Sequence, residues 1–187
     1  MSLTFNVIIL VKELIIMKQS IADFYNDIIR MCKTFAELED TSFEPEEGAS
    51  EEEIAKCEEI LGASLPDDIK DFFRLTKGIS IEEIGDFYIV MPTEAFENED
   101  GGKSTCIGNS YLKDYFIDLE NGTASSFDDG LGEQKVFDSI EDMFDDMYFG
   151  IMRLADDNYP DEWQEVYDEL FPDNKIEFGE ELCDDDE

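Results

Sequence analysis

The sequence predicts an α+β fold, in which a mostly antiparallel sheet is flanked by N-terminal and C-terminal helices in a single domain. Apolar residues recur at helical spacing through residues 20–78, alternate between 86 and 137, and return to helical spacing from 139 onward. Helices, then strands, then helices is the order of an α+β domain rather than of alternating βαβ units. The chain has 187 residues and is 42% hydrophobic, which suffices for one real core.

Two helices are predicted at the start of the domain. The first covers residues 20–38, where the apolar side chains follow a helical period. The second covers 50–61, because Ser50 and Glu53 have capping-box spacing. Gly62 follows it, and glycine suits the left-handed residue that ends many helices.

A third helix is predicted within GASLPDDIKDFFRLTKG, residues 62–78. Ser64 or Leu65 is its expected cap, and Pro66 suits the first turn because proline lacks an N–H that would be unpaired there. Gly78 is expected to end it.

Strands are predicted where the apolar period changes to two. The expected segments are 86–91, 104–108, 111–119 and 135–137. Asn121-Gly122 separates the third segment from TASSFD, and Asn-Gly favours a two-residue type I′ turn. These residues therefore predict a β-hairpin.

Two more helices are predicted after the strands, one opening at Ser139 and one at Pro160. The domain boundaries are set at residues 17–178. Residues 1–16 are apolar but too short for a membrane span, and we interpret them as a possible N-terminal extension. Residues 179–187 form an acidic tail.

The charge of the chain is its most unusual property. Fifty acidic residues against thirteen basic ones give a formal net charge of −37. Such a field repels nucleic acid and anionic membranes, because both are bound through Lys and Arg, and it favours a basic partner. The plainer interpretation is that the acidity keeps the protein soluble.

The chain contains no histidine, which excludes Ser-His-Asp and Cys-His catalysis and the common zinc motifs. The four cysteines are Cys32, Cys57, Cys106 and Cys183, and none forms a CxxC pair. They are expected to be reduced thiols in a cytoplasmic protein. We expect no catalytic residue, no metal and no cofactor.

The segments EEEIAKCEEILG, SLPDDIKDFFRLTKG, YFIDLENG and VFDSIEDMFDDM occur in this order between about residues 43 and 155. In that order they resemble the SUKH superfamily, with Lys77-Gly78 replacing the more common asparagine-glycine. The positions that match the family pattern are Leu65, Pro66, Gly78, Asp118 and Gly122, and we interpret them as structural residues.

The resemblance implies an α+β fold and a non-enzymatic role. Members of this superfamily are mostly bacterial immunity proteins that bind and block a polymorphic or contact-dependent toxin domain, often a nuclease, and a fungal branch regulates cell-wall synthesis. The implied partner is a basic toxin domain, with no nucleic acid and no membrane. The alternative is a protein-interaction or regulatory module without a toxin partner. The oligomeric state, monomer or dimer, stays open.

Two loops are the candidate binding sites, because loops on a rigid scaffold carry much of protein function. Each combines carboxylates with a phenylalanine that could anchor a partner. The residues are Glu94, Phe96, Glu97, Glu99 and Asp100 in the first loop and Phe127, Asp128 and Asp129 in the second. Solvated loops without a binding role are the plainer interpretation.

Three other functions compete with toxin binding. Neither loop has EF-hand spacing, so a specific calcium site is disfavoured. Among fifty acidic residues, some carboxylate pair will always have glycosidase spacing, so such a pair carries little weight. A nucleic-acid mimic would share the basic partner but not the family resemblance.

Overall fold

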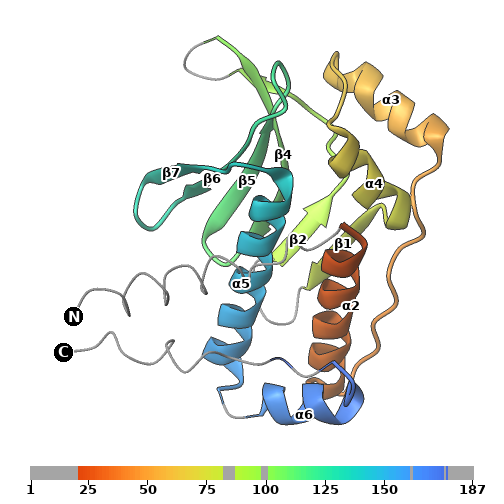
Figure 1. Ribbon diagram of the computed structural model, residues 1–187, viewed down its shortest axis with the longest axis vertical. Helices are drawn as coiled ribbons and strands as arrows, with labels where there is room; N and C mark the ends of the chain where they lie inside the picture. Colours follow the sequence, from red (N-terminus) through yellow and green to blue (C-terminus); the bar gives the residue numbers. More distant parts are fainter. Residues whose placement is uncertain (1–20, 82–86, 98–100, 161, 175, 177–187) are drawn as a thin grey trace, which may run out of the picture.

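The computed structural model describes residues 21–81, 87–97, 101–160, 162–174 and 176. They form an α+β domain with a seven-stranded antiparallel sheet, which confirms the predicted fold class (Figure 1). The strand order is β1-β2-β4-β5-β6-β7, and β3 pairs with β4 outside this path. The predicted extension and the whole acidic tail lie outside the described residues.

Helices and strands follow the chain in the order helix, strand, helix. The helices are α2 (Ile21–Leu38), α3 (Glu51–Leu61), α4 (Asp67–Leu75), α5 (Ile140–Asn158) and α6 (Trp163–Leu170). The strands are β1 (Gly78–Ile81), β2 (Phe87–Val90), β3 (Phe96–Glu97), β4 (Lys103–Ser110), β5 (Lys113–Asp118), β6 (Ala124–Asp128) and β7 (Glu133–Val136). All predicted helices are present, although α6 begins three residues after Pro160.

The start of α3 forms as its sequence predicts. The Ser50 hydroxyl accepts a hydrogen bond from the Glu53 amide, and the Glu53 carboxylate accepts one from the Ser50 amide at 2.9 Å. Hydrogen bonds from Lys77 and then from Ser50 lower the pKa of Glu53 to about 2. Gly62 adopts φ 69° after the helix, as expected for a left-handed end.

The predicted ends of α4 are wrong on two points. Pro66 occupies the N-cap position itself and supplies no side-chain cap; instead, Glu58 of α3 accepts hydrogen bonds from the Ser64 hydroxyl and the Leu65 amide, each at 2.9 Å. Gly78 does not end the helix but begins β1. A Cβ at Gly78 would lie 3.2 Å from the Ile89 carbonyl oxygen, so glycine serves close strand approach there.

Three aromatic rings join the helices in the core. Phe24 of α2 stacks on Phe144 of α5 with ring centroids 4.4 Å apart, and Phe72 of α4 lies 5.3 Å from Phe144. All three side chains are at most 1% exposed. Rings at these separations stabilise a core beyond the area they bury, so this cluster fixes α2, α4 and α5 against one another.

Helix α5 lies directly on the sheet because Gly150 allows it. A Cβ at Gly150 would fall 2.0 Å from the Ser110 hydroxyl oxygen. The Ser110 hydroxyl donates a hydrogen bond to the Met147 carbonyl at 2.8 Å, so strand β4 is tied to the helix one turn before the glycine. Helices α2, α4 and α5 thus cover one side of the sheet (Figure 1).

Two turns of the sheet share one design. Asp118 and Asp128 each end a strand, and each carboxylate accepts hydrogen bonds from the amides two and three residues later, at 2.8 to 3.1 Å. Gly122 and Gly132 follow four residues after each aspartate with φ 75° and 68°. The predicted hairpin at Asn121 is present, but its loop spans 119–122 rather than a two-residue type I′ turn, because Asp118 pairs with Thr123.

Candidate functional site

The two candidate loops lie at opposite ends of the sheet. The first loop precedes Lys103, which begins β4. The second group lies at the end of β6, where Asp128 pairs with Lys113 of β5. Lys113 in turn pairs with Ser110, the last residue of β4. Seven residue steps along β4 separate the ends by roughly 23 Å. The structure therefore does not bring the two groups into one cluster.

The first group lies around the short strand β3. Phe96 is 43% exposed and pairs with Ser104, which places its side chain on the side of the sheet away from the helices. Glu94 and Glu97 are exposed, and the Glu94 carbonyl accepts a hydrogen bond from Thr105 at 2.7 Å. Glu99 and Asp100 lie outside the described residues.

The second group lies on β6 and its turn. Phe127 is 38% exposed and points away from the helices, and Asp129 is exposed. The Asp128 carboxylate accepts the two amide hydrogen bonds of the turn. Asp128 is therefore a turn residue as well as a candidate contact.

Between the two groups, the side of the sheet away from α2, α4 and α5 presents aromatic and acidic side chains; we call it the outer face. The strand register sets them in adjacent cross-strand rows. The outer face comprises Tyr88, Cys106, Asn109, Asp114, Phe116, Asp118, Phe127, Gln134 and Val136, all half-buried or exposed. In this face the described chain offers a broad, mixed surface of the kind that hot spots occupy.

One polar atom on the outer face lacks a partner. Asn109 donates through Nδ2 to Asp114 Oδ1 at 3.0 Å, while its own Oδ1 is buried with no hydrogen bond from the described residues. A buried acceptor without a donor costs free energy, and a donor brought by a partner would remove that cost.

Sequence reasoning missed Asp114 and Phe116, which connect the two groups, and gave Asp118 only a structural role. Asp114, Phe116 and Asp118 alternate along YLKDYFIDL, so a period of two was visible. The side of the sheet that these residues occupy was not visible, because only the register of β5 with β4 shows that the three side chains point away from α5.

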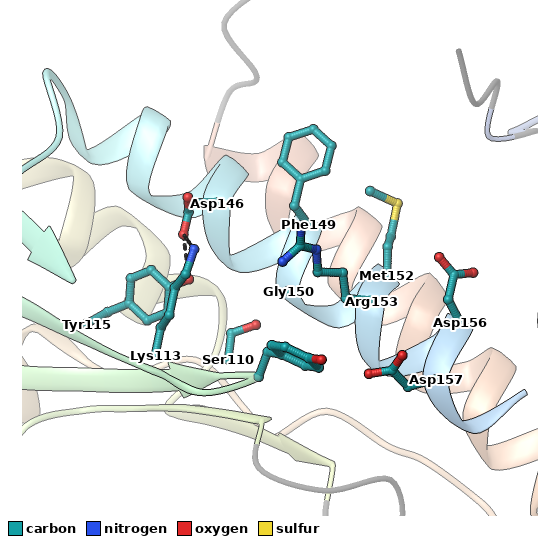
Figure 2. Close-up of a pocket in the computed structure, with 11 residues that line it drawn as sticks. Ser110, Lys113, Tyr115, Asp146, Phe149, Gly150, Met152, Arg153, Asp156 and Asp157 are labelled. Carbon is teal, nitrogen blue, oxygen red and sulfur yellow. Dashed lines mark hydrogen bonds and ion pairs between the residues drawn. The ribbon is translucent and has the colours of Figure 1, made fainter. Parts of the chain in front are cut away.

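On the helix side, Asp146 of α5 binds three groups from the sheet, and Figure 2 shows two of them, Lys113 and Tyr115. Lys135 Nζ lies 2.6 Å from Oδ1, and Lys113 Nζ and the Tyr115 hydroxyl lie 3.0 and 2.8 Å from Oδ2. Burial alone would raise the pKa of Asp146, but the hydrogen bonds from Lys135, Tyr115 and Lys113 outweigh burial and leave its pKa lowered. We call these four residues the Asp146 clamp.

A cavity of about 530 Å³ opens beside the clamp, between α5 and the β4–β5 turn (Figure 2). Its lining includes Arg153 and the exposed Phe149. The Ser110 and Tyr115 hydroxyls in its wall donate to the helix, so both already serve packing. Tyr111 in its lining has φ 58°, which is rare for an aromatic residue.

The described residues hold neither a metal site nor a membrane-spanning helix. No three His, Cys, Asp or Glu side chains come together there in a way that could hold a metal ion. The helices that the structure describes are all too short or too polar to cross a membrane.

The profile of the SMI1/KNR4 family (SUKH-1) matches residues 48–186. The chain belongs to this family. The match confirms the resemblance found in the sequence, starts five residues later than expected and extends past residue 155 through α6. No curated protein and no solved structure matched the chain.

The positions that match the SUKH pattern have structural contacts. Leu65 is 3% exposed, Pro66 opens α4, and Gly78 lies against β2. Asp118 and Gly122 build the turn after β5. Among the described cysteines, Cys32, Cys57 and Cys106 form no disulfide.

Proposed function

We propose that this SUKH-1 protein is an immunity protein, which neutralises a basic toxin domain by covering it with the outer face of its sheet. The family includes toxin immunity proteins, and the chain belongs to it by a match over residues 48–186. The observation that carries the proposal is the outer face itself, where Phe116 and Phe127 stand among Asp114 and Asp118 with no described helix above them.

The chemistry of the outer face suits a partner rich in Lys and Arg. Exposed rings supply apolar area and attract cations over their faces, while carboxylates beside them take charge-assisted hydrogen bonds. The net charge of −37 would speed encounter with a basic domain. A nuclease toxin must carry cations to hold phosphates, so an acidic protein on that surface would compete with its substrate.

The partner can be sought directly. The full chain is immobilised, exposed to lysate of its source organism, and washed at low and at moderate salt before the retained proteins are identified by mass spectrometry. One basic toxin domain retained at moderate salt supports the proposal. Loss of every retained protein at moderate salt would show that the charge acts without specificity.

The interface is tested with matched variants against that toxin. We expect Phe127→Ala to weaken binding, because truncating an anchor residue typically costs about 1 to 2 kcal/mol or more. Ile60→Ala is the control, because Ile60 on α3 is 54% exposed but lies off the sheet. Equal affinity for both variants would place the interface elsewhere.

Charge reversals show which end of the sheet meets the toxin. Glu97→Lys and Asp129→Lys alter exposed carboxylates at the two opposite ends. The end closer to the toxin is expected to show the larger fall in association rate at low salt. If this protein binds the toxin but does not protect cells that express it, the regulatory alternative is favoured.

A further inference from the structure

Among the strands that the structure describes, β7 pairs with β6 alone, so it is an open edge of that sheet, and all four of its residues are exposed. The Phe137 amide donates to the Ala124 carbonyl at 3.0 Å, which fixes the alternation of the ladder. By that alternation the backbone N–H and C=O groups of Lys135 and Glu133 form hydrogen bonds with β6. The backbone N–H and C=O groups of Gln134 and Val136 point away from β6, toward the open edge.

The opposite edge of the sheet is different. In β1, Gly78, Ile79 and Ile81 are buried. Residues 42–46 run beside this strand and share the lining of one groove with Gly78 and Ser80. In the described part of the chain, β7 therefore offers the more accessible edge.

A lysine on an edge strand usually blocks the addition of another strand. In β7 that lysine is Lys135, and the Asp146 clamp binds its side chain. Lys135 Nζ is 2.6 Å from Asp146 of α5 and lies 4.6 Å above the centre of the Phe137 ring. Its charge is therefore directed toward the helix and paired with the Asp146 carboxylate rather than set across the edge.

The side chains beside the edge define what could be added. On the outer face Val136 is 64% exposed, and Phe127 lies next to Gln134 on β6. On the helix side Glu133 is exposed, and Lys135 is already paired. An added strand would meet an apolar surface on the outer face and the exposed Glu133 carboxylate on the helix side.

We propose that β7 accepts an extended segment of the partner as an added strand, in which apolar residues alternate with basic ones. The backbone of that segment would bond Gln134 and Val136, its apolar side chains would cover Val136, and its basic side chains would lie near Glu133. This inference rests on the proposed function, since the segment belongs to the toxin domain.

A proline variant isolates the backbone contact. Gln134→Pro removes an N–H that points away from β6, so the ladder within the sheet is kept and the fold tolerates the change. Ser80→Pro is the matched control on the opposite edge. The Met91 amide donates to the Lys77 carbonyl, and the alternation from that bond makes the Ser80 N–H on β1 point away from β2. The ¹H–¹⁵N NMR spectrum of each variant shows whether it is folded.

The probe is an acetylated and amidated heptapeptide, Lys-Val-Lys-Val-Lys-Val-Lys, titrated into the full chain and followed by ¹H–¹⁵N NMR. We expect the amides of Gln134 and Val136, but not that of Lys135, to shift downfield and to exchange more slowly. The peptide Lys-Lys-Val-Val-Val-Lys-Lys keeps composition and charge but loses the alternation. Equal effects of both peptides would overturn the inference, even if the proline variants failed to fold.

Loss of one backbone hydrogen bond predicts about tenfold weaker peptide binding by Gln134→Pro. A loss of at least about threefold relative to Ser80→Pro supports the inference, and any smaller loss overturns it. The captured toxin separates the two proposals. If Gln134→Pro still binds and neutralises it like the wild type, the immunity function stands and the added strand is wrong; if no toxin binds the wild type, the proposed function itself fails.

Discussion

Two adjacent aspartates on α5 lie in opposite electrostatic environments. Asp146 is held by Lys135, Tyr115 and Lys113, which lower its pKa in spite of its burial. Asp145 has its pKa raised, first by burial and then by the nearby carboxylates, Asp142 among them. The same side-chain type therefore stabilises the fold at one position and destabilises it at the next.

Asp146→Asn is expected to lower the free energy of unfolding at neutral pH by about 1 to 3 kcal/mol, because it leaves the clamp donors without a charged acceptor. A lowered pKa contributes stability above the ordinary carboxyl pKa and loses it as pH falls through the folded value. The difference between wild type and variant should therefore shrink in acid. Urea unfolding at several pH values measures it, and a constant difference would contradict the clamp.

Asp145→Asn is expected to do the reverse and raise stability by about 0.5 to 1 kcal/mol at neutral pH, because it removes like-charge repulsion and the burial of a charge. A raised pKa costs stability above the folded value, and this cost disappears as pH falls toward the ordinary value. Urea unfolding again reports the change. A less stable variant at neutral pH would show that the carboxylate makes a favourable contact.

Some residue roles could be predicted from the sequence and others could not. The capping box of Ser50 and Glu53 is local, so spacing alone identified it. The Asp146 clamp joins positions up to 33 residues apart, and among fifty acidic residues nothing local distinguishes Asp146 from Asp145. Only the packing of α5 on β5 and β7 selects it.

At the scale of elements, the orientation of β7 sets a pattern of amide exchange. In the protein without a partner, the amides of Gln134 and Val136 should exchange rapidly because they face solvent, while that of Lys135 should be protected by its bond to β6. Hydrogen exchange followed by NMR measures the three amides. Protection at Gln134 would mean that this edge is already covered.

Removing the aspartate from either of the two turns is expected to lower the free energy of unfolding by a similar amount. Asp118→Ala and Asp128→Ala each remove an acceptor of two amide hydrogen bonds and should each cost about 1 to 2 kcal/mol. Thermal unfolding measures both, with Asp129→Ala as the control, because the turn amides donate to Asp128 and not to Asp129. Unchanged stability of Asp128→Ala would make its carboxylate available for binding alone.

The elements with a clear period and caps were predicted well, and the short ones were not. Strand β1 was missed because Gly78 follows α4 so closely that it resembled a helix end. Strand β3 has two residues, too few for any period to show. The separation of the two candidate loops depends on pairing between β4 and β5, which no local pattern contains.

For the whole molecule, the net charge of −37 sets the response to salt. Repulsion among carboxylates opposes the compact state, and at 0.1 M ionic strength salt largely screens this repulsion between charges more than about 10 Å apart. We expect Tm to rise by roughly 5 °C between low and high salt. Differential scanning calorimetry measures the change. A Tm that falls as salt rises would mean that attractive ion pairs, such as those of Arg74 with Glu51 and Asp71, dominate.

The central claim is that the outer face of this SUKH-1 protein neutralises a basic toxin domain. Its most direct test is growth of cells that express the captured toxin together with the wild type, Phe127→Ala or Ile60→Ala, at matched immunity-protein levels. The account predicts that the wild type and Ile60→Ala restore growth and that Phe127→Ala restores it less. Failure of the wild type to protect, or full protection by Phe127→Ala, would contradict the account.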